Sequence, residues 1–202
     1  MKIKNFDGLA TSKTRRSVLE IIEAGLVAID THDLIKRQVR LINGSLVINK
    51  DTFSLKQIKR IFVVGVGKCS LEAGGALEEV LGDQITDGIV IDVKEGHLRK
   101  IKTYKGSHPL PTEVNIDAPK KIIRLLDGLN ENDLVIFMIS GGGSTFLCQP
   151  NNFTYHEEVQ IIERLFEVGV NIKDLNTVRK HLSLARGGYL AEYAYPAKVV
   201  SL

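Results

Sequence analysis

The spacing of hydrophobic residues changes near residue 60, and this change divides the chain into two stretches. Before it, Val18, Ile22 and Leu26 recur at the spacing of an amphipathic helix. A second, short helix is predicted from 33 to 41, so the first fifty residues are expected to be helical. After residue 60, short hydrophobic runs alternate with helical spacing, which is typical of strands joined by helices.

The second stretch predicts a series of elements with recognisable ends. Thr154 and Glu157 form a capping box before one helix, and Asn171 can cap the next helix. The last hydrophobic run is expected to be a buried strand in the middle of a sheet. In chain order, the expected strands are 61–65, 89–93, 101–105 (at a sheet edge), 134–139 and 198–202, and the expected helices are 69–81, 111–128 and 155–168.

Strands that alternate with helices favour a parallel sheet covered on both faces. We therefore predict an α/β fold, a Rossmann-like three-layer sandwich that follows an N-terminal helical segment. Because complete domains seldom stop inside a core strand, residues 1–202 are interpreted as a domain that is incomplete at its C-terminus. Ligands of such sheets bind beyond the carboxyl ends of the strands.

Composition and charge narrow the class of protein. Hydrophobic residues make up 44% and charged residues 25% of the chain, as in globular proteins. The 27 basic and 24 acidic residues are interspersed, so the net charge of +3 does not indicate a nucleic-acid partner. The sequence shows no signal segment or membrane-spanning run, and Cys69 and Cys148 fit reduced thiols. These features predict a cytoplasmic protein.

A glycine-containing turn, Gly65–Lys68, follows the first predicted strand. Glycines such as Gly67 let the backbone approach a ligand, the following helix N-terminus favours an anion, and Lys68 adds a positive charge. Ser70 stands where the dinucleotide fingerprint needs a third glycine, and Cys69 breaks the phosphate-loop pattern. A tight turn with a solvated lysine is an equally good interpretation.

A second glycine-rich loop follows the most hydrophobic strand, and it comprises Ser140, Gly141, Gly142, Gly143, Ser144 and Thr145. Consecutive backbone N–H groups beside hydroxyls suit phosphate or carboxylate oxygens. The alternative is a flexible connector. We favour a ligand loop, because it is expected at the carboxyl end of a strand.

Two further groups of residues could contribute to a site. Asn176, Arg179 and Lys180 fall on one side of a predicted helix, which is either a solvated basic face or a ligand-binding one. His108 lies in an extended segment with prolines at 109 and 111. A lone histidine is more often structural than functional.

In order, these motifs resemble the type II glycerate kinases, whose second domain is the MOFRL domain. The matching stretches are GVGK at 65–68, KEGH at 94–97, HPLP at 108–111, ENDLVIFMISGGGST at 131–145 and NTVRKHLS with two glycines at 176–188. They cover most of residues 10–202. The resemblance implies the N-terminal portion of such a kinase, without a MOFRL domain.

The resemblance also implies an activity and roles for residues. The family phosphorylates glycerate at its 2-position with ATP and Mg²⁺, in a cleft between two domains. Lys68 would be the catalytic, phosphate-side lysine, and His108, Gly67, the 140–144 loop and the basic helix would bind substrate or phosphate. The chain would be inactive alone, or would need a complementary C-terminal chain.

Two mild departures and two other functions remain to be weighed. Arg186 stands where the family commonly has lysine, and Ser107 stands where glycine is common. One alternative is a non-catalytic remnant that binds an anion or a partner chain. The other is a phosphosugar isomerase-like domain, which would explain the serine and glycine loop but not the basic helix.

Overall fold

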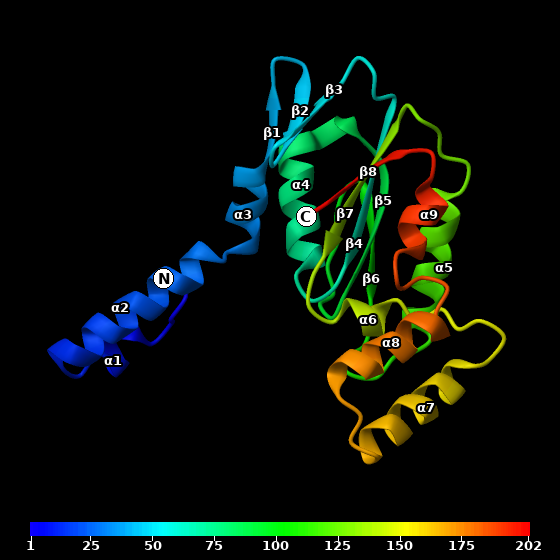
Figure 1. The fold of residues 1–202 in the computed structure, drawn as a ribbon. Helices are drawn as coiled ribbons and strands as arrows, with labels where there is room; N and C mark the ends of the chain where they lie inside the picture. Colours follow the sequence, from blue (N-terminus) through cyan, green and yellow to red (C-terminus); the bar gives the residue numbers. More distant parts are fainter.

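The computed structural model describes residues 1–202, and a five-stranded parallel sheet forms its centre (Figure 1). Its strands lie in the order β6-β5-β4-β7-β8. Numbered along the chain from β4, this order is 3-2-1-4-5, as in Rossmann folds. The predicted α/β fold is confirmed. The strands are β4 (Arg60–Val66), β5 (Ile85–Asp92), β6 (Ile101–Lys105), β7 (Asp133–Ile139) and β8 (Lys198–Ser201).

Helices cover both faces of this sheet because its central strands are hydrophobic on both sides. Val63 of β4 belongs to the core with Leu77 of α4 (Ser70–Leu81). The next residue, Val64, belongs to a second core with Ile122 of α5 (Val114–Leu126). Helix α9 (Tyr189–Ala194) joins α5 on that second face, and a short 3-10 turn, η1 (Gly82–Gln84), follows α4. The result is three layers.

The segment between β7 and α9 holds three helices beyond the carboxyl ends of the strands (Figure 1). They are α6 (Gly143–Phe146), α7 (Tyr155–Glu167) and α8 (Ile172–Leu182). The capping box of Thr154 and Glu157 is confirmed, and the Asn171 side chain accepts hydrogen bonds from the backbone of Lys173 and Asp174. Local sequence therefore sets where α7 and α8 begin.

The N-terminal segment contains α1 (Phe6–Leu9), α2 (Lys13–Ala28) and α3 (Thr31–Gln38). Helix α2 confirms the predicted amphipathic helix, but it extends away from the sheet and buries none of its residues (Figure 1). Val18, Ile21 and Ile22 stay exposed along it. No helix in the structure combines the length and the hydrophobicity needed to span a bilayer.

The prediction that the first fifty residues are helical is wrong beyond Gln38. Strands β1 (Val39–Ile42), β2 (Ser45–Ile48) and β3 (Asp51–Ser54) form a separate antiparallel sheet. Asn43 and Gly44 both adopt positive φ in the turn between β1 and β2, the conformation for which Asn-Gly is favoured in tight hairpins. Leu46 and Ile48 are buried at every second position, in the core that includes α4. The signal in the sequence was that these hydrophobic residues recur at every second position, which is the period of a strand.

The final strand also differs from its prediction. Strand β8 pairs only with β7, so it is an edge strand of the five-stranded sheet. Val200 is buried, but Val199 is 41% exposed. A run of hydrophobic residues does not by itself show how many neighbours a strand has.

An ion pair ties the beginnings of β4 and β7 together. The buried carboxylate of Asp133 accepts two hydrogen bonds from the Arg60 guanidinium, at 2.8 and 2.6 Å, and one from the Asn130 N–H at 2.8 Å. The Arg60 hydrogen bonds hold the pKa of Asp133 below its ordinary value, and the Asn130 N–H adds to this effect against the opposing effect of burial. The pair fixes the register of the two strands that carry the glycine turns.

We expect Asp133→Asn to lower the free energy of unfolding near neutral pH by about 2 kcal/mol, because the buried partner loses its charge-assisted bonds. The native pKa is lowered, so this stabilisation is present above the ordinary aspartate pKa and disappears as the pH falls through the native one. Denaturant titrations at several pH values should therefore show the two proteins converging in acid. Asp127→Asn, at an exposed position without an ion pair, is the control. A constant difference at all pH values would contradict the prediction.

Candidate functional site

The two glycine turns lie side by side at the point where the strand order of the sheet reverses. Strands β4 and β7 are paired in parallel, with Val66 opposite Ile139 at their carboxyl ends. The chain leaves β4 toward α4 on one face and leaves β7 toward the core of the other face, where Phe146 is buried. A crevice at such a switch point is the usual ligand site of open α/β sheets.

The first turn does not offer its backbone amides to a ligand. The Lys68 N–H donates to the Gly141 carbonyl at 3.0 Å, and the Cys69 N–H donates to the Ser140 hydroxyl at 3.2 Å. The Gly67 N–H donates to the carbonyl of Ile91 at 3.1 Å. Hydrogen bonds within the protein therefore satisfy these N–H groups, which agrees with the alternative of a tight turn that carries an exposed lysine.

Gly67 is needed for the close packing of the two turns. It is buried with φ of 126°, and a Cβ atom there would lie 2.2 Å from the Ser140 hydroxyl oxygen. Any side chain would push the two turns apart. Lys68 differs, because its side chain is exposed and forms neither an ion pair nor a hydrogen bond. Lys68 therefore supplies the one charged side chain of this turn that is exposed to a ligand.

The second turn keeps several amides available. The N–H groups of Gly141, Gly142 and Ser144 donate to no acceptor in the protein. Gly142 has φ of 94°, a conformation that side-chain-bearing residues rarely adopt. A loop with adjacent unpaired N–H groups beside a hydroxyl suits an anion, as the sequence predicted.

His108 lies over this loop. A Cβ atom at Gly142 would meet His108 Cδ2 at 3.0 Å, and the imidazole ring centre is 6.2 Å from that of Phe146. Burial lowers the pKa of His108, and the positive charges of Lys68 and Arg179 lower it further. The imidazole is therefore neutral at neutral pH and can accept a proton or a hydrogen bond.

Helix α8 brings the basic group to the same place. Leu175 is fully buried, which turns Asn176, Arg179 and Lys180 toward the loop. Burial lowers the pKa of Arg179, as does the nearby charge of Arg186, but a guanidinium stays protonated in proteins. The helix therefore presents cations and an amide to the loop.

Together these residues line an open hollow of about 500 Å³. It unites most of the predicted site, whereas Gly67, Lys68 and Gly141 lie outside its lining. Lys68 is still near enough for its charge to lower the pKa of His108. The lining consists of His108, Ile139, Ser140, Gly142, Gly143, Ser144, Thr145, Leu147, Asn176, Arg179, Lys180, Arg186 and Gly187.

The charge of this hollow is one-sided. Its lining includes arginine and lysine side chains but no carboxylate. Glu158 of α7 lines the small pocket beside the hollow, and it is buried and paired with Arg186 at 2.6 Å. Because Mg²⁺ prefers carboxylate and other oxygen ligands, these residues do not form a protein metal site. The positive charge of the hollow therefore suits an anionic ligand.

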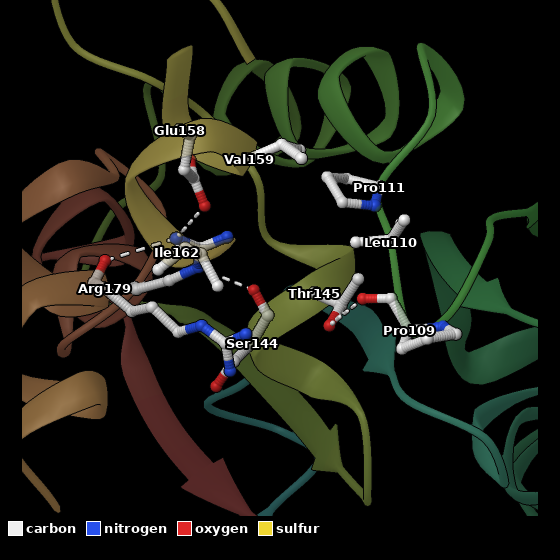
Figure 2. A pocket seen from close by; sticks show the side chains of 10 residues that line it. Pro109, Leu110, Pro111, Ser144, Thr145, Glu158, Val159, Ile162 and Arg179 are labelled. Atoms are coloured by element: carbon white, nitrogen blue, oxygen red, sulfur yellow. Dashed lines mark hydrogen bonds and ion pairs between the residues drawn. The ribbon is translucent and has the colours of Figure 1, made fainter. Parts of the chain in front are cut away.

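Sequence reasoning missed Glu158. It is 3% exposed on α7, four residues before the buried Ile162, so it stands on the hydrophobic side of an amphipathic helix. The signal that could have revealed it is an acidic residue on the side of the helix that faces the core. A buried carboxylate needs a charged or hydrogen-bonding partner. Figure 2 shows Glu158 in a small neighbouring pocket, facing Arg179 and Ser144 across it, with Pro109 and Pro111 on the other side.

Comparison with known proteins places the chain in a family. Residues 17–202 match the family model described as "Domain of unknown function (DUF4147)". The chain belongs to this family. It is 36% identical over 174 residues to D-glycerate 2-kinase of Thermotoga maritima, covering 84% of this chain and 42% of that protein. Further relatives, from Picrophilus torridus to cattle, are also named glycerate kinases, and the chain matches the N-terminal portion of such enzymes.

Two relatives have a different name, and two solved structures support the fold. A protein of Agrobacterium vitis named as a hydroxypyruvate reductase is 36% identical over 200 residues, covering 93% of this chain and 45% of its own length. The crystal structure of a Pyrococcus horikoshii OT3 protein superposes with a TM-score of 0.82 and 27% identity, over 95% of this chain and 43% of its own. The chain thus spans less than half the length of these relatives.

We expect Gly142→Ala to destabilise the protein by about 1–2 kcal/mol, because alanine is strained at positive φ and its Cβ would crowd the His108 and Phe146 rings. Gly141→Ala is the matched control, since a Cβ there has nothing within 4 Å and its φ is not positive. Denaturant unfolding of both variants measures the difference. Equal stabilities would show that the loop is a loose connector.

We also expect Arg179→Gln to raise the pKa of His108 toward its ordinary value. The smaller charge contributions of Lys68 and Arg179 lower that pKa, so removing one cation should restore part of it, while burial keeps the rest of the shift. The pH dependence of the imidazole proton resonance in NMR spectra measures the pKa. Arg164→Gln, on the exposed end of α7, should leave it unchanged. An unaltered pKa in Arg179→Gln would mean that the two side chains are not neighbours.

Proposed function

We propose that the chain is the acceptor-side part of a glycerate 2-kinase, which transfers the γ-phosphoryl group of ATP to the 2-hydroxyl of glycerate. The observation that carries the proposal is the carboxylate-free hollow at the switch point, where unpaired amides of one loop face the cations of α8. The names of several relatives support glycerate as the acceptor. The hollow suits a small molecule with a carboxylate and a phosphate.

The residues have distinct roles in this proposal. Arg179, Lys180 and Asn176 hold the carboxylate of glycerate, with the amides of Gly142 and Ser144 opposite. Lys68, which no other side chain neutralises, faces the transferred phosphoryl group. Phosphoryl transfer depends mainly on such positioning and charge neutralisation.

His108 accounts for the proton. As the oxygen of the 2-hydroxyl forms its bond to the γ-phosphorus, the bond from that phosphorus to the bridging oxygen breaks and ADP leaves. The hydroxyl proton passes to the neutral imidazole of His108, which later releases it to water. The lowered pKa of His108 keeps the ring able to accept a proton near neutral pH.

ATP and Mg²⁺ require groups that the hollow does not supply. Its lining contains no aromatic side chain except the imidazole and no carboxylate, so adenine and the metal would be held elsewhere. Mg²⁺, when bound, would neutralise charge on the phosphates that carry it. We propose that a complementary chain, equivalent to the part of the relatives that this chain does not match, completes the nucleotide side. A non-catalytic anion-binding remnant is the alternative.

The Agrobacterium relative is named as a hydroxypyruvate reductase, which favours reduction with a nicotinamide cofactor. The first glycine turn argues against that chemistry in this chain. A dinucleotide fingerprint needs a third glycine where Ser70 stands. It also needs free amides for the pyrophosphate, and here the amides of Lys68 and Cys69 are bonded within the protein. A coupled assay for oxidation of a nicotinamide cofactor with hydroxypyruvate provides the direct comparison.

We expect the chain alone to give little ADP release with glycerate and ATP, and the pair of chains to form 2-phosphoglycerate. In the pair, Lys68→Ala should lower the rate by at least about 100-fold, which is the typical effect of removing one preorganised electrostatic contact. Lys56→Ala, in the exposed turn after β3, should leave it unchanged.

Three outcomes would contradict these expectations. Robust turnover by the chain alone would disprove the need for a second chain. An unchanged rate in Lys68→Ala would exclude the lysine from the site. Phosphate binding without turnover in any combination would favour the non-catalytic alternative.

A further inference from the structure

A single buried guanidinium contacts both walls of the hollow and the helix behind them. Arg186 Nε donates to the Ser144 carbonyl at 2.6 Å, and its Nη1 donates to the Arg179 carbonyl at 3.2 Å. The same Nη1 is 2.6 Å from a carboxylate oxygen of Glu158. In Figure 2, the dashed lines that end at Ser144, Arg179 and Glu158 mark these three contacts. The glycine loop, α8 and α7 thus meet at one side chain.

We propose that Arg186 and Glu158 form a positioning clamp, which sets the distance between the glycine loop and the basic helix and thereby shapes the anion hollow. The clamp acts through Ser144 and Arg179, whose backbone it holds while their other groups face the hollow. It concerns the geometry of an anion site and rests on the proposed function only in requiring that the hollow binds an anion.

Energetics favour a geometric role over a stabilising one. The two side chains are 5% and 4% exposed, so both charges are removed from water. Desolvation commonly offsets the attraction in such a pair, and replacing the pair by hydrophobic residues is often neutral or stabilising. A buried pair that also satisfies two carbonyl groups is better explained by the arrangement that it specifies.

Glu158 also determines which of the basic side chains around the hollow keep an unneutralised charge. It neutralises Arg186 from the side of α7, and its second carboxylate oxygen accepts a hydrogen bond from the buried Cys148 thiol at 3.3 Å. Glu158 lines the small pocket behind the hollow but not the hollow itself. Arg179 and Lys180 are therefore left unneutralised where an anion would bind.

The fork of a guanidinium suits this task. Its several N–H groups lie in one plane and reach three acceptors at once, whereas lysine supplies a single point of charge on a flexible stem. Lysine at position 186 could still pair with Glu158 but could not hold both carbonyl groups in the same way. We therefore expect Arg186→Lys to keep part of the clamp.

The experiment uses the chain as it exists, with inorganic phosphate as the probe. The double variant Glu158→Leu with Arg186→Met removes the clamp without leaving an unpaired buried charge. Arg186→Lys is the conservative variant, and Glu167→Gln, at an exposed ion pair of α7, is the control. Three quantities are measured for each: the free energy of unfolding, the NMR shifts and hydrogen exchange of the amides at 141–144, and the dissociation constant for phosphate.

We expect the double variant to unfold at nearly the wild-type denaturant concentration, while its loop amides shift and exchange faster. Its dissociation constant for phosphate should rise about 10-fold, the scale of losing a residue that orients ligand-binding groups. Arg186→Lys should lie between wild type and the double variant in both readouts. A purely structural role would instead change stability and leave the loop and the affinity of the folded protein as they were.

Two results would overturn the proposal. One is wild-type loop shifts and wild-type phosphate affinity in the double variant. If that variant does not fold, Arg186→Lys decides, and unchanged loop shifts would refute the clamp. If phosphate fails to bind even the wild-type chain, the proposed function loses its supporting observation, while the loop shifts still test the clamp.

Discussion

The close contact between two turns, at the ends of neighbouring parallel strands, is the constraint on which the site depends. The pairing of β4 with β7 brings the Gly67 and Ser140 backbones to the same level, and no side chain fits between them. The first turn consequently uses its amides to hold the second. The Gly142 and Ser144 amides remain available because the first turn supports the loop from behind.

The charged side chains of the site also fall into two groups, one buried behind the loop and one exposed on the open side. The buried Arg186 and Glu158 neutralise one another behind the loop, whereas Arg179, Lys180 and Lys68 have no acidic partner. A low dielectric around the buried pair strengthens its mutual attraction, but it also makes any unpaired charge there costly. Positive charge therefore accumulates on the open side, where a ligand can neutralise it.

The named relatives are longer than the region described by this structure, so the hollow corresponds to only part of those proteins. The relatives named glycerate kinases extend well beyond the region that matches this chain. Within that region the structure provides cations, unpaired amides and a neutral imidazole, which suit an acceptor and a phosphoryl group. It provides neither carboxylates for a metal nor an aromatic surface for a base in the hollow.

The sequence by itself determined the five strands of the parallel sheet and the helices α4, α5, α7 and α8, because continuous hydrophobic runs and capping residues such as Asn171 are local signals. It did not predict the short helices α6 and α9. Family resemblance also pointed to the loop at 140–144 and to Arg179. Only the tertiary structure decided that Gly67 packs against Ser140, since that contact depends on a turn over seventy residues away. It also decided that Glu158 pairs with Arg186, and that β8 lies at an edge. Burial and pairing depend on which segments meet in space, and local spacing carries no record of that.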